Sequence, residues 1–163
     1  MLDYRPMIAS SGADAAALFS LLQQALGFSL VVHGRLPNLE DATEAISEVP
    51  PGKDMKDKFF GGYWQNGVLV GCMDLIRGYP EPDIAYLGLL VFSEARQGQG
   101  LGVLALAHIA NLSRSWGCTA LRLAVVDRNA RALAFWQREG FRELYRKPGT
   151  QYAGHAIVME RAL

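Results

Sequence analysis

The chain has 163 residues, of which 50% are hydrophobic and 20% charged, a composition typical of a folded domain and unlike that of disordered or collagenous proteins. Its 16 basic and 16 acidic residues give a formal net charge of zero, so no overall field attracts nucleic acid or an anionic membrane. We therefore expect a single domain over residues 1–163 with a small-molecule or peptide partner.

The N-terminal third has the pattern of a strand followed by helices. Residues 3–9 are expected to form a strand, and residues 12–27 a helix, because apolar residues recur there every three or four positions. Residues 33–57 contain several prolines and more acidic than basic side chains, which indicates a mobile, substrate-facing segment. Within it, Asn38 is expected to cap a short helix that runs through Ile46.

The middle of the chain has the pattern of a β-hairpin and a buried strand. Two strands between residues 59 and 78 are joined at Asn66-Gly67, and both of these residues tolerate the positive φ that a tight hairpin needs. The run 84–92 is almost continuously apolar, which predicts a central strand buried on both faces.

The last third alternates strands and helices around a glycine-rich loop. Residues 98–102 read Gly-Gln-Gly-Leu-Gly and precede an amphipathic helix that ends at Gly117. We expect the remaining elements to be a strand at 119–126, a helix at 129–139 and strands at 141–147 and 155–161. This order predicts a mixed α/β fold with helices on the faces of one sheet.

Cysteine and histidine usage predicts neither disulfides nor a metal site. Cys72 and Cys118 form no Cys-x-x-Cys pair, and the three histidines are scattered. The N-terminus carries Asp3 and Arg5 where a secretory signal needs an apolar run, and no apolar stretch is long enough to cross a bilayer. We therefore expect a cytoplasmic protein with free thiols and no membrane partner.

The glycine-rich loop predicts an anion site. A glycine turn at a helix N-terminus exposes unpaired backbone N–H groups at the positive end of the helix dipole, which suits phosphate. Two familiar nucleotide motifs are absent, because no Gly-Lys-Ser/Thr follows the loop and the dinucleotide pattern would need glycine at Val103. Taken alone, the glycines are equally compatible with a tight strand-to-helix turn.

Two segments together resemble the GNAT superfamily of acetyl-CoA-dependent N-acetyltransferases. Residues 87–110 resemble its first signature, in which a buried strand precedes Gln/Arg-x-x-Gly-x-Gly/Ala, matched here by Gln97, Gly100 and Gly102. Residues 125–141 resemble its second signature. The residues that match it are Asn129, Ala132, Phe135, Gly140 and Phe141. The resemblance covers about the last hundred residues and implies a mixed, mostly antiparallel sheet with splayed central strands and helices on both faces.

The resemblance implies acetyl-CoA as the co-substrate, with no metal. It places three groups of residues at the cofactor: backbone of Leu90, Val91 and Phe92 at the pantetheine arm; Gln97, Gly98, Gln99, Gly100, Leu101 and Gly102 at the pyrophosphate; and Asn129, Phe135 and Trp136 beside the arm. Asn129 also has the sequence position of a helix cap, and the two roles are compatible.

Acetyl transfer to an amine requires a neutral amine, stabilisation of the thioester oxygen and a proton for the leaving thiolate. A backbone N–H near Val91 is expected to hold the oxygen, a contribution of about 3 kcal/mol. Where many relatives have a proton-donating tyrosine, this chain has Trp136, whose indole does not titrate. Protonation of the thiolate therefore has no side-chain candidate in the motif.

Three side chains are candidates for accepting the proton of the amine. Some relatives carry a glutamate at the position of Tyr86, and Asp83 and Asp74 lie on or beside the neighbouring strands. Each also has an ordinary structural interpretation: a half-buried tyrosine, a turn-forming aspartate and a solvated strand aspartate. His108 lies beside an apolar helix stripe and is expected to be structural.

Charge is unevenly distributed along the chain. Residues 38–57 contain six acidic and two basic side chains, whereas residues 122–147 contain seven basic and three acidic ones. The basic segment suits the phosphates of the cofactor, and the acidic segment suits a cationic acceptor.

The resemblance thus implies transfer of an acetyl group from acetyl-CoA to a primary amine, a small molecule or a peptide N-terminus, by direct attack within a ternary complex. No cysteine is placed for a covalent intermediate. A non-catalytic acyl-CoA sensor is the main alternative, suggested by Trp136, and a structural homodimerisation domain is a third. All three interpretations are compatible with a homodimer, and none of them predicts a nucleic-acid partner.

Overall fold

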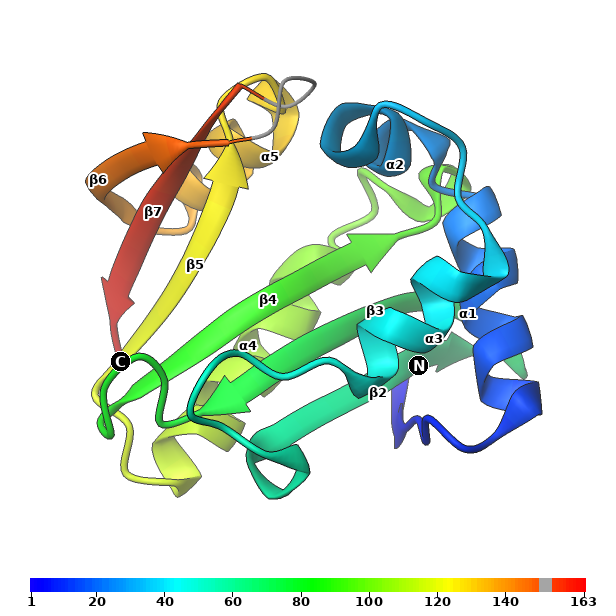
Figure 1. Cartoon of the computed structure of the whole chain (residues 1–163), viewed down its shortest axis with the longest axis horizontal. Coiled ribbons are helices and arrows are strands. Elements are labelled where there is room, and N and C mark those ends of the chain that lie inside the picture. Colours follow the sequence, from blue (N-terminus) through cyan, green and yellow to red (C-terminus); the bar gives the residue numbers. More distant parts are fainter. Residues whose placement is uncertain (150–153) are drawn as a thin grey trace.

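The structure, a computed structural model, describes residues 1–149 and 154–163 (Figure 1). The strands within the described residues are β1 (Asp3–Pro6), β2 (Lys58–Gln65), β3 (Val68–Arg77), β4 (Ile84–Phe92), β5 (Ala120–Val126), β6 (Arg142–Pro148) and β7 (His155–Ala162). The helices are α1 (Gly12–Gln23), α2 (Leu26–His33), α3 (Leu39–Ser47), α4 (Leu101–Ser115) and α5 (Ala130–Arg138), with short 3-10 turns η1 (Met55–Asp57) and η2 (Glu94–Arg96).

One sheet organises the molecule, in the strand order β1-β2-β3-β4-β5-β7-β6. All neighbouring strands are antiparallel except β4 and β5, which are parallel and pair only over 84–87 and 120–123. Beyond these residues β4 stays beside β3 while β5 stays beside β7, so the two central strands diverge (Figure 1). The mixed sheet with splayed central strands is therefore confirmed.

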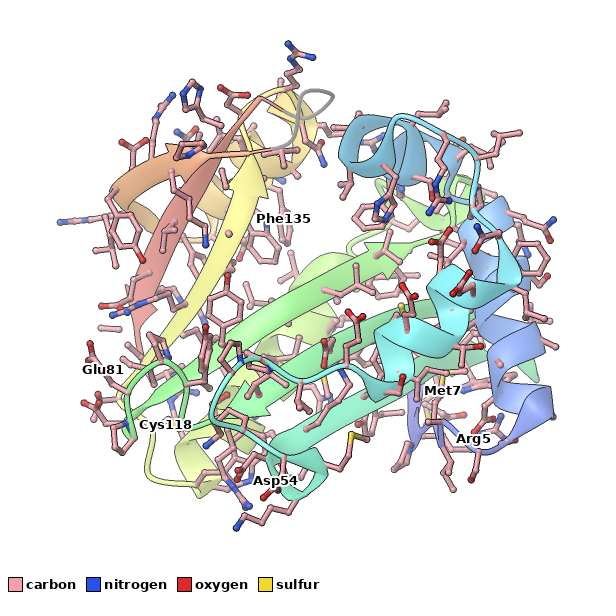
Figure 2. All side chains as sticks on the ribbon, viewed as in Figure 1. Arg5, Met7, Asp54, Glu81, Cys118 and Phe135 are labelled. Atoms are coloured by element: carbon pink, nitrogen blue, oxygen red, sulfur yellow. The ribbon has the colours of Figure 1, made fainter. Side chains whose placement is uncertain are left out.

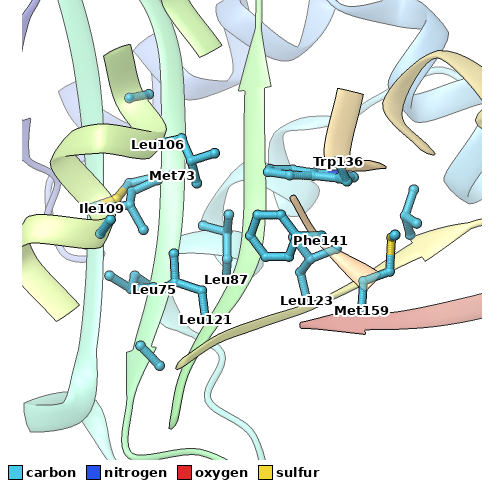
Figure 3. Packing of buried hydrophobic residues seen from close by; sticks show 14 of the residues in the cluster. Met73, Leu75, Leu87, Leu106, Ile109, Leu121, Leu123, Trp136, Phe141 and Met159 are labelled. Atoms are coloured by element: carbon cyan, nitrogen blue, oxygen red, sulfur yellow. The ribbon is translucent and has the colours of Figure 1, made fainter. Parts of the chain in front are cut away.

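Helices cover both faces of the sheet, as predicted. On one face, Leu106 and Ile109 of α4 pack against Leu75 and Leu121, in a cluster that continues to Trp136 of α5 (Figure 3). On the other face, α1 and α3 supply a second apolar cluster against β2 and β3. Figure 1 shows α3 and α4 on opposite sides of the strands. Burial of each large side chain contributes roughly 1.5–3 kcal/mol, so the sheet is held rigidly from both faces.

The predicted hairpin is confirmed. Strand β2 ends at Gln65 and β3 begins at Val68, and the residues between them, Asn66 and Gly67, have φ of 51° and 77°. Positive φ at both central positions matches the right-handed twist of the flanking strands.

The prediction of one helix over residues 12–27 is wrong at the C-terminal end. Helix α1 stops at Gln23 and α2, which was not predicted, starts at Leu26 after an 87° bend. The backbone N–H of Glu94 donates to the Gln24 carbonyl (2.8 Å), and the Glu94 carboxylate accepts from the Gly27 N–H (2.9 Å). These contacts to a distant loop fix the bend, so tertiary structure overrides the local helical pattern.

Helix α3 begins where the sequence predicts. The Asn38 side chain accepts from the Asp41 N–H (2.9 Å), and the Asp41 carboxylate accepts from the Asn38 N–H (2.9 Å), so the two residues cap the helix reciprocally. The hydrogen bond from the Arg35 guanidinium lowers the pKa of Asp41 to about 2. The acidic segment is therefore partly neutralised by its own neighbours.

Strand β4 contains an irregularity at the point where β5 departs. The register with β3 pairs Asp74 with Leu89 and Leu75 with Leu87, which leaves Gly88 as the extra residue of a β-bulge. Gly88 is exposed, in contrast to the predicted burial of this strand on both faces, because β5 no longer covers it. The bulge thus coincides with the opening between the central strands.

Candidate active site

A cleft of about 850 Å³ opens where β4 and β5 separate. Its walls come from the end of β4, the loop that follows, and helices α2, α4 and α5. The lining residues are Gly27, Phe28, Val31, Leu90, Val91, Phe92, Glu94, Arg96, Gln97, Gly98, Gly100, Leu101, Gly102, Val103, Asn129, Arg131, Ala132, Ala134, Phe135, Trp136 and Arg138. All residues predicted to bind the cofactor belong to this set except Gln99.

The glycine loop has the geometry of an anion site. Gly98 and Gly100 have φ of 75° and 81°, and Gly100 is the N-cap residue of α4. No described side chain caps α4, so the N–H groups of its first turn face the cleft without an intrahelical partner. Together with the dipole of a 15-residue helix, they make a site for a phosphate group.

The two glutamines of the loop have different contacts. Gln97 donates from Nε2 to the Phe92 carbonyl (3.0 Å), which fastens the loop to the end of β4. Gln99 donates to the Ala95 carbonyl (3.1 Å) and is not part of the cleft lining. Gln97 therefore shapes the loop, and any contact of Gln99 with the cofactor stays a prediction.

Asn129 performs the capping role foreseen for it and also lines the cleft. Its Oδ1 accepts from the Ala132 N–H (3.2 Å) at the start of α5. The capping bond uses the amide oxygen, which leaves the Nδ2 group for a ligand.

Aromatic side chains form the α5 wall of the cleft. Phe135 lies beside the opening between β5 and β4 (Figure 2), and a Cβ on Gly102 would come within 3.2 Å of its ring. Glycine at this position thus allows α4 and α5 to approach closely. Trp136 is 8% exposed and packs edge-on against Phe135 and Phe141, so its indole is part of the core as well as of the cleft wall.

The charged residues of the cleft are mostly basic. Arg96 follows the end of β4, and Arg131 and Arg138 come from α5. The acidic residue of the described lining, Glu94, is engaged by the Gly27 N–H. Three guanidinium groups beside an uncapped helix N-terminus suit a ligand that carries several phosphates.

Two of the three proton-acceptor candidates lie away from the cleft. Asp83 precedes the first residue of β4 and accepts a hydrogen bond from Thr119 Oγ1 (3.1 Å). The cleft begins at Leu90, seven residues further, which corresponds to roughly 23 Å along a strand. Tyr86 packs edge-on against Tyr79, and burial raises the pKa of its hydroxyl, so it is neutral and a poor proton acceptor near neutral pH.

Asp74 is the candidate nearest to the cleft. It lies opposite Leu89, one residue from the lining residue Leu90. It is not the solvated aspartate that the sequence suggested, because its side chain is 18% exposed and pairs with the buried Lys58 (2.9 Å). Burial raises the pKa of Asp74, and the Lys58 ammonium opposes that rise.

The histidine and cysteine candidates lie outside the cleft lining. His108 Nδ1 is 3.0 Å from Tyr63 Oη, in keeping with the structural role expected for it. Cys72 and Cys118 are both buried and unbridged, and burial raises the pKa of Cys72. In the described part of the chain, no group of three or more His, Cys, Asp and Glu side chains is arranged to hold a metal ion.

Several lining residues escaped the sequence analysis. Helix α2 contributes Gly27, Phe28 and Val31, and it was not predicted because its start depends on Glu94, 67 residues away. Lys58, which pairs with Asp74 and does not line the cleft, also had no distinguishing signal, since a lysine at the start of a strand is usually exposed. Arg131 and Arg138, by contrast, were visible as part of the basic segment 122–147.

Comparison with known proteins identifies the family. The model of the Acetyltransferase (GNAT) family matches residues 31–141. The chain belongs to the GNAT family. A crystal structure of an acetyltransferase from Thermus thermophilus is 30% identical, with a TM-score of 0.82 over 100% of this chain and 97% of the other.

Two more distant GNAT structures share the fold. The ribosomal-protein-S18-alanine N-acetyltransferase of Escherichia coli is 20% identical, with a TM-score of 0.72 over 99% of this chain and 94% of its own. The PaiA N-acetyltransferase of Thermoplasma acidophilum, solved with coenzyme A, is 15% identical, with a TM-score of 0.71 over 100% and 99%. Membership of the GNAT family supports acyl transfer from acetyl-CoA. The family does not identify the acceptor, since one scaffold hosts many acceptors.

Helix α1 and helix α2 together have the length and hydropathy of a membrane span, but the 87° bend separates them. No single helix among the described residues meets that test alone.

Proposed function

We propose that this GNAT protein transfers an acetyl group from acetyl-CoA to a primary amine by direct attack in a ternary complex. The observation that carries the proposal is the cleft between the splayed strands, which joins an uncapped helix N-terminus to the exposed backbone edge of β4. A small molecule or a peptide N-terminus fits the acceptor role, and we expect no nucleic-acid or membrane partner.

The residues present suit acetyl-CoA along the whole cleft. The N–H groups of the first turn of α4 would hold the pyrophosphate, and Arg96, Arg131 and Arg138 would neutralise phosphate charge. The edge of β4 at Leu90–Phe92, which β5 leaves unpaired, would bind the amide groups of the pantetheine arm. When bound, the cofactor supplies the activated thioester.

Direct attack is favoured over a covalent enzyme intermediate. Cys72 is fully buried in the α1 and α3 cluster, and neither cysteine lines the cleft. Backbone N–H groups at the β4 edge are the donors available to the thioester oxygen. Trp136 cannot protonate the thiolate, so we expect that proton to come from the amine nitrogen or from water.

Turnover separates this proposal from a non-catalytic acyl-CoA sensor. Release of the CoA thiol is measured with acetyl-CoA and a panel of polyamines, amino acids and peptides with free N-termini, and the product is identified by mass spectrometry. The proposal predicts thiol release that depends on an amine and an amine product 42 Da heavier, roughly the mass of one added acetyl group. Tight binding of acetyl-CoA with no thiol release from any amine would favour the sensor.

A further inference from the structure

Strand β5 has an unpaired edge beside the opening between the central strands. Its pairing with β4 stops at the rung that joins Leu87 and Leu123, whereas its pairing with β7 continues to Val126. Residues 124–126 therefore have a partner strand on one side only, and their other side faces the opening (Figure 1). The lining of the cofactor cleft includes the edge of β4 but none of residues 124–126, so the β5 edge is left for another ligand.

The alternation of backbone groups along β5 shows which of them face the opening. Just beyond the strand, the Asp127 N–H donates to the His155 carbonyl (2.9 Å), on the β7 side. The register between β5 and β7 is continuous over residues 120–126. Because successive residues of a strand direct their backbone groups to opposite sides, the odd-numbered residues of β5 face β7, and Ala124 and Val126 face the opening.

The Ala124 carbonyl and the Val126 N–H take part in no ladder or turn hydrogen bond of the described residues. By the same alternation, the Ala124 N–H belongs to the last rung with β4. The Val126 carbonyl accepts from the Asn129 N–H (3.0 Å). Unpaired backbone groups at the edge of a sheet are a template for one more strand.

The remaining acceptor and donor match one residue of an extended peptide. In a parallel ladder, a residue donates its N–H to one carbonyl of the neighbouring strand and accepts on its own carbonyl from the N–H two positions further. Ala124 and Val126 stand in that relation. An antiparallel strand would instead need both groups of Ala124, and its N–H is used by the rung with β4. The edge is therefore suited to a chain that runs parallel to β5.

The charged groups near the narrow end of the opening are already paired. Asp74, which lies opposite Leu89 on β4, binds Lys58 (2.9 Å). On β5 and β7, Arg122 binds Glu160 (2.6 Å). Neither pair leaves a free charge for a second cationic or anionic group of the acceptor. Hydrogen bonding to uncharged amide groups is what this side of the opening supplies.

We propose, on the basis of the acetyltransferase function above, that the acceptor is a peptide N-terminus that binds as a short parallel strand on the β5 edge. The N–H of its second residue donates to the Ala124 carbonyl, and the carbonyl of that residue accepts from the Val126 N–H. This chain direction places the terminal amine at the narrow end of the opening. There the amine nitrogen forms a C–N bond as the thioester C–S bond breaks, and one nitrogen proton passes to the thiolate, giving an acetamide and CoA thiol.

The register also assigns the side chains of the peptide. Its second residue lies beside Val125, which is 7% exposed and belongs to the apolar cluster that contains Trp136. Ala124 is exposed on the opposite face, where α1 and α3 pack on β2, β3 and β4 only. Paired side chains of neighbouring strands point to the same face. The second residue of the peptide is therefore small, whereas the first and third point to the open face.

Tetra-alanine amides with a single ester bond test the backbone contacts with the full chain. An ester oxygen in place of the N–H of the second residue removes the donor to Ala124, and kcat/KM for thiol release should fall roughly three- to tenfold. The same replacement at the third residue is the matched control, because that N–H faces away from β5, and kcat/KM should change less than about twofold. Leucine at the second position should lower kcat/KM by about tenfold or more through overpacking, and leucine at the third position should not.

A variant of the edge tests the same contact from the side of the enzyme. Val126→Pro removes the free N–H and no bond of the ladder with β7, and proline is tolerated where the N–H faces an open edge. We expect kcat/KM for tetra-alanine amide to fall roughly three- to tenfold. Arg146→Pro is the matched control, since Arg146 lies opposite Ile157, which faces β5, so the Arg146 N–H points to the outer edge of the sheet. If Val126→Pro does not fold, the ester peptides decide the question alone.

The outcomes distinguish this acceptor from the proposed function. Equal effects of the esters at the second and third residues, or equal kcat/KM for tetra-alanine amide and simple alkylamines, overturn the peptide acceptor and leave the acetyltransferase intact. Loss of acetyl-CoA affinity by about tenfold or more in folded Val126→Pro, measured by calorimetry, also overturns it, because the cofactor would then occupy the β5 edge. A wild-type chain that binds acetyl-CoA but releases no thiol with any amine overturns the proposed function, and the peptide acceptor with it.

Discussion

At the scale of single residues, the proposed anion site at the glycine loop depends on a backbone conformation that side chains disfavour. Gly100 has a φ of 81° at the N-cap of α4, with open space around it. A glutamate there is both strained and negatively charged where the cofactor phosphates would lie. We predict that Gly100→Glu weakens acetyl-CoA binding by more than about 2 kcal/mol, a loss of affinity of roughly thirtyfold or more in calorimetry.

Gly117→Glu is the matched control for this prediction. Gly117 also has a positive φ (80°) and open surroundings, but it lies beyond the other end of α4 and outside the cleft lining. Both variants should lose about 1 kcal/mol or more of stability through the disfavoured φ, and only Gly100→Glu should lose the cofactor. Equal affinities in the two folded variants would contradict the assignment of the loop.

The difference between the two kinds of site residue explains what could be predicted. Gly100 and Asn129 belong to contiguous motifs in which local backbone geometry creates the binding groups, so sequence spacing identifies them. The environment of Asp74 depends on Lys58, 16 residues earlier, and on the bulge at Gly88. Burial and register decide these contacts, and neither can be read from a short motif.

At the scale of elements, α2 is attached through Glu94 to the loop that follows β4. The Glu94 carboxylate accepts from the Gly27 N–H in the first turn of α2, and its own N–H donates to Gln24. A carboxylate at a helix N-terminus stabilises the helix by capping and by charge. We predict that Glu94→Ala lowers the free energy of unfolding by about 0.5–2 kcal/mol in urea titrations and accelerates amide hydrogen exchange over residues 26–33.

Two comparisons make the Glu94 prediction specific. Glu94→Gln keeps a side-chain oxygen for Gly27 and should lose less stability than Glu94→Ala. Helix α3, which carries its own Asn38 and Asp41 cap, should exchange at the wild-type rate in both variants. Uniformly faster exchange across α2 and α3 would instead indicate a global loss of stability.

The helices and the hairpin also show which features of the elements can be predicted from the sequence and which cannot. The Asn66-Gly67 turn and the Asn38 cap are set by residues within a few positions, and both were predicted correctly. The break between α1 and α2 contains no proline and has Gly27 inside the second helix, so the local pattern continues through it. Contacts from Glu94 determine the break, and only the folded chain supplies them.

At the scale of the whole molecule, the acidic segment 38–57 and the basic segment 122–147 differ less in unpaired charge than the sequence suggests. Within the acidic segment, Asp41 pairs with Arg35, and Asp57 with Lys53 and Arg77. Within the basic segment, Arg122 pairs with Glu160 and Arg146 with Glu143. The charge that would act on a cofactor in the cleft is local, at the three arginines that line it, and charges paired elsewhere in the fold are screened from it.

The cleft therefore predicts selective stabilisation of the whole domain by its cofactor. A ligand at one hundred times its dissociation constant stabilises the native state by about 2.7 kcal/mol, which for a chain of this size raises Tm by roughly 5 to 10 °C. We expect this rise with acetyl-CoA in a thermal unfolding experiment, and a much smaller one with NAD or ATP, which lack the pantetheine arm that the β4 edge accommodates. Gly100→Glu should abolish the shift while unfolding cooperatively. An equal rise with all three nucleotides would mean that phosphate binding at α4 dominates and that the open edge of β4 contributes little to recognition.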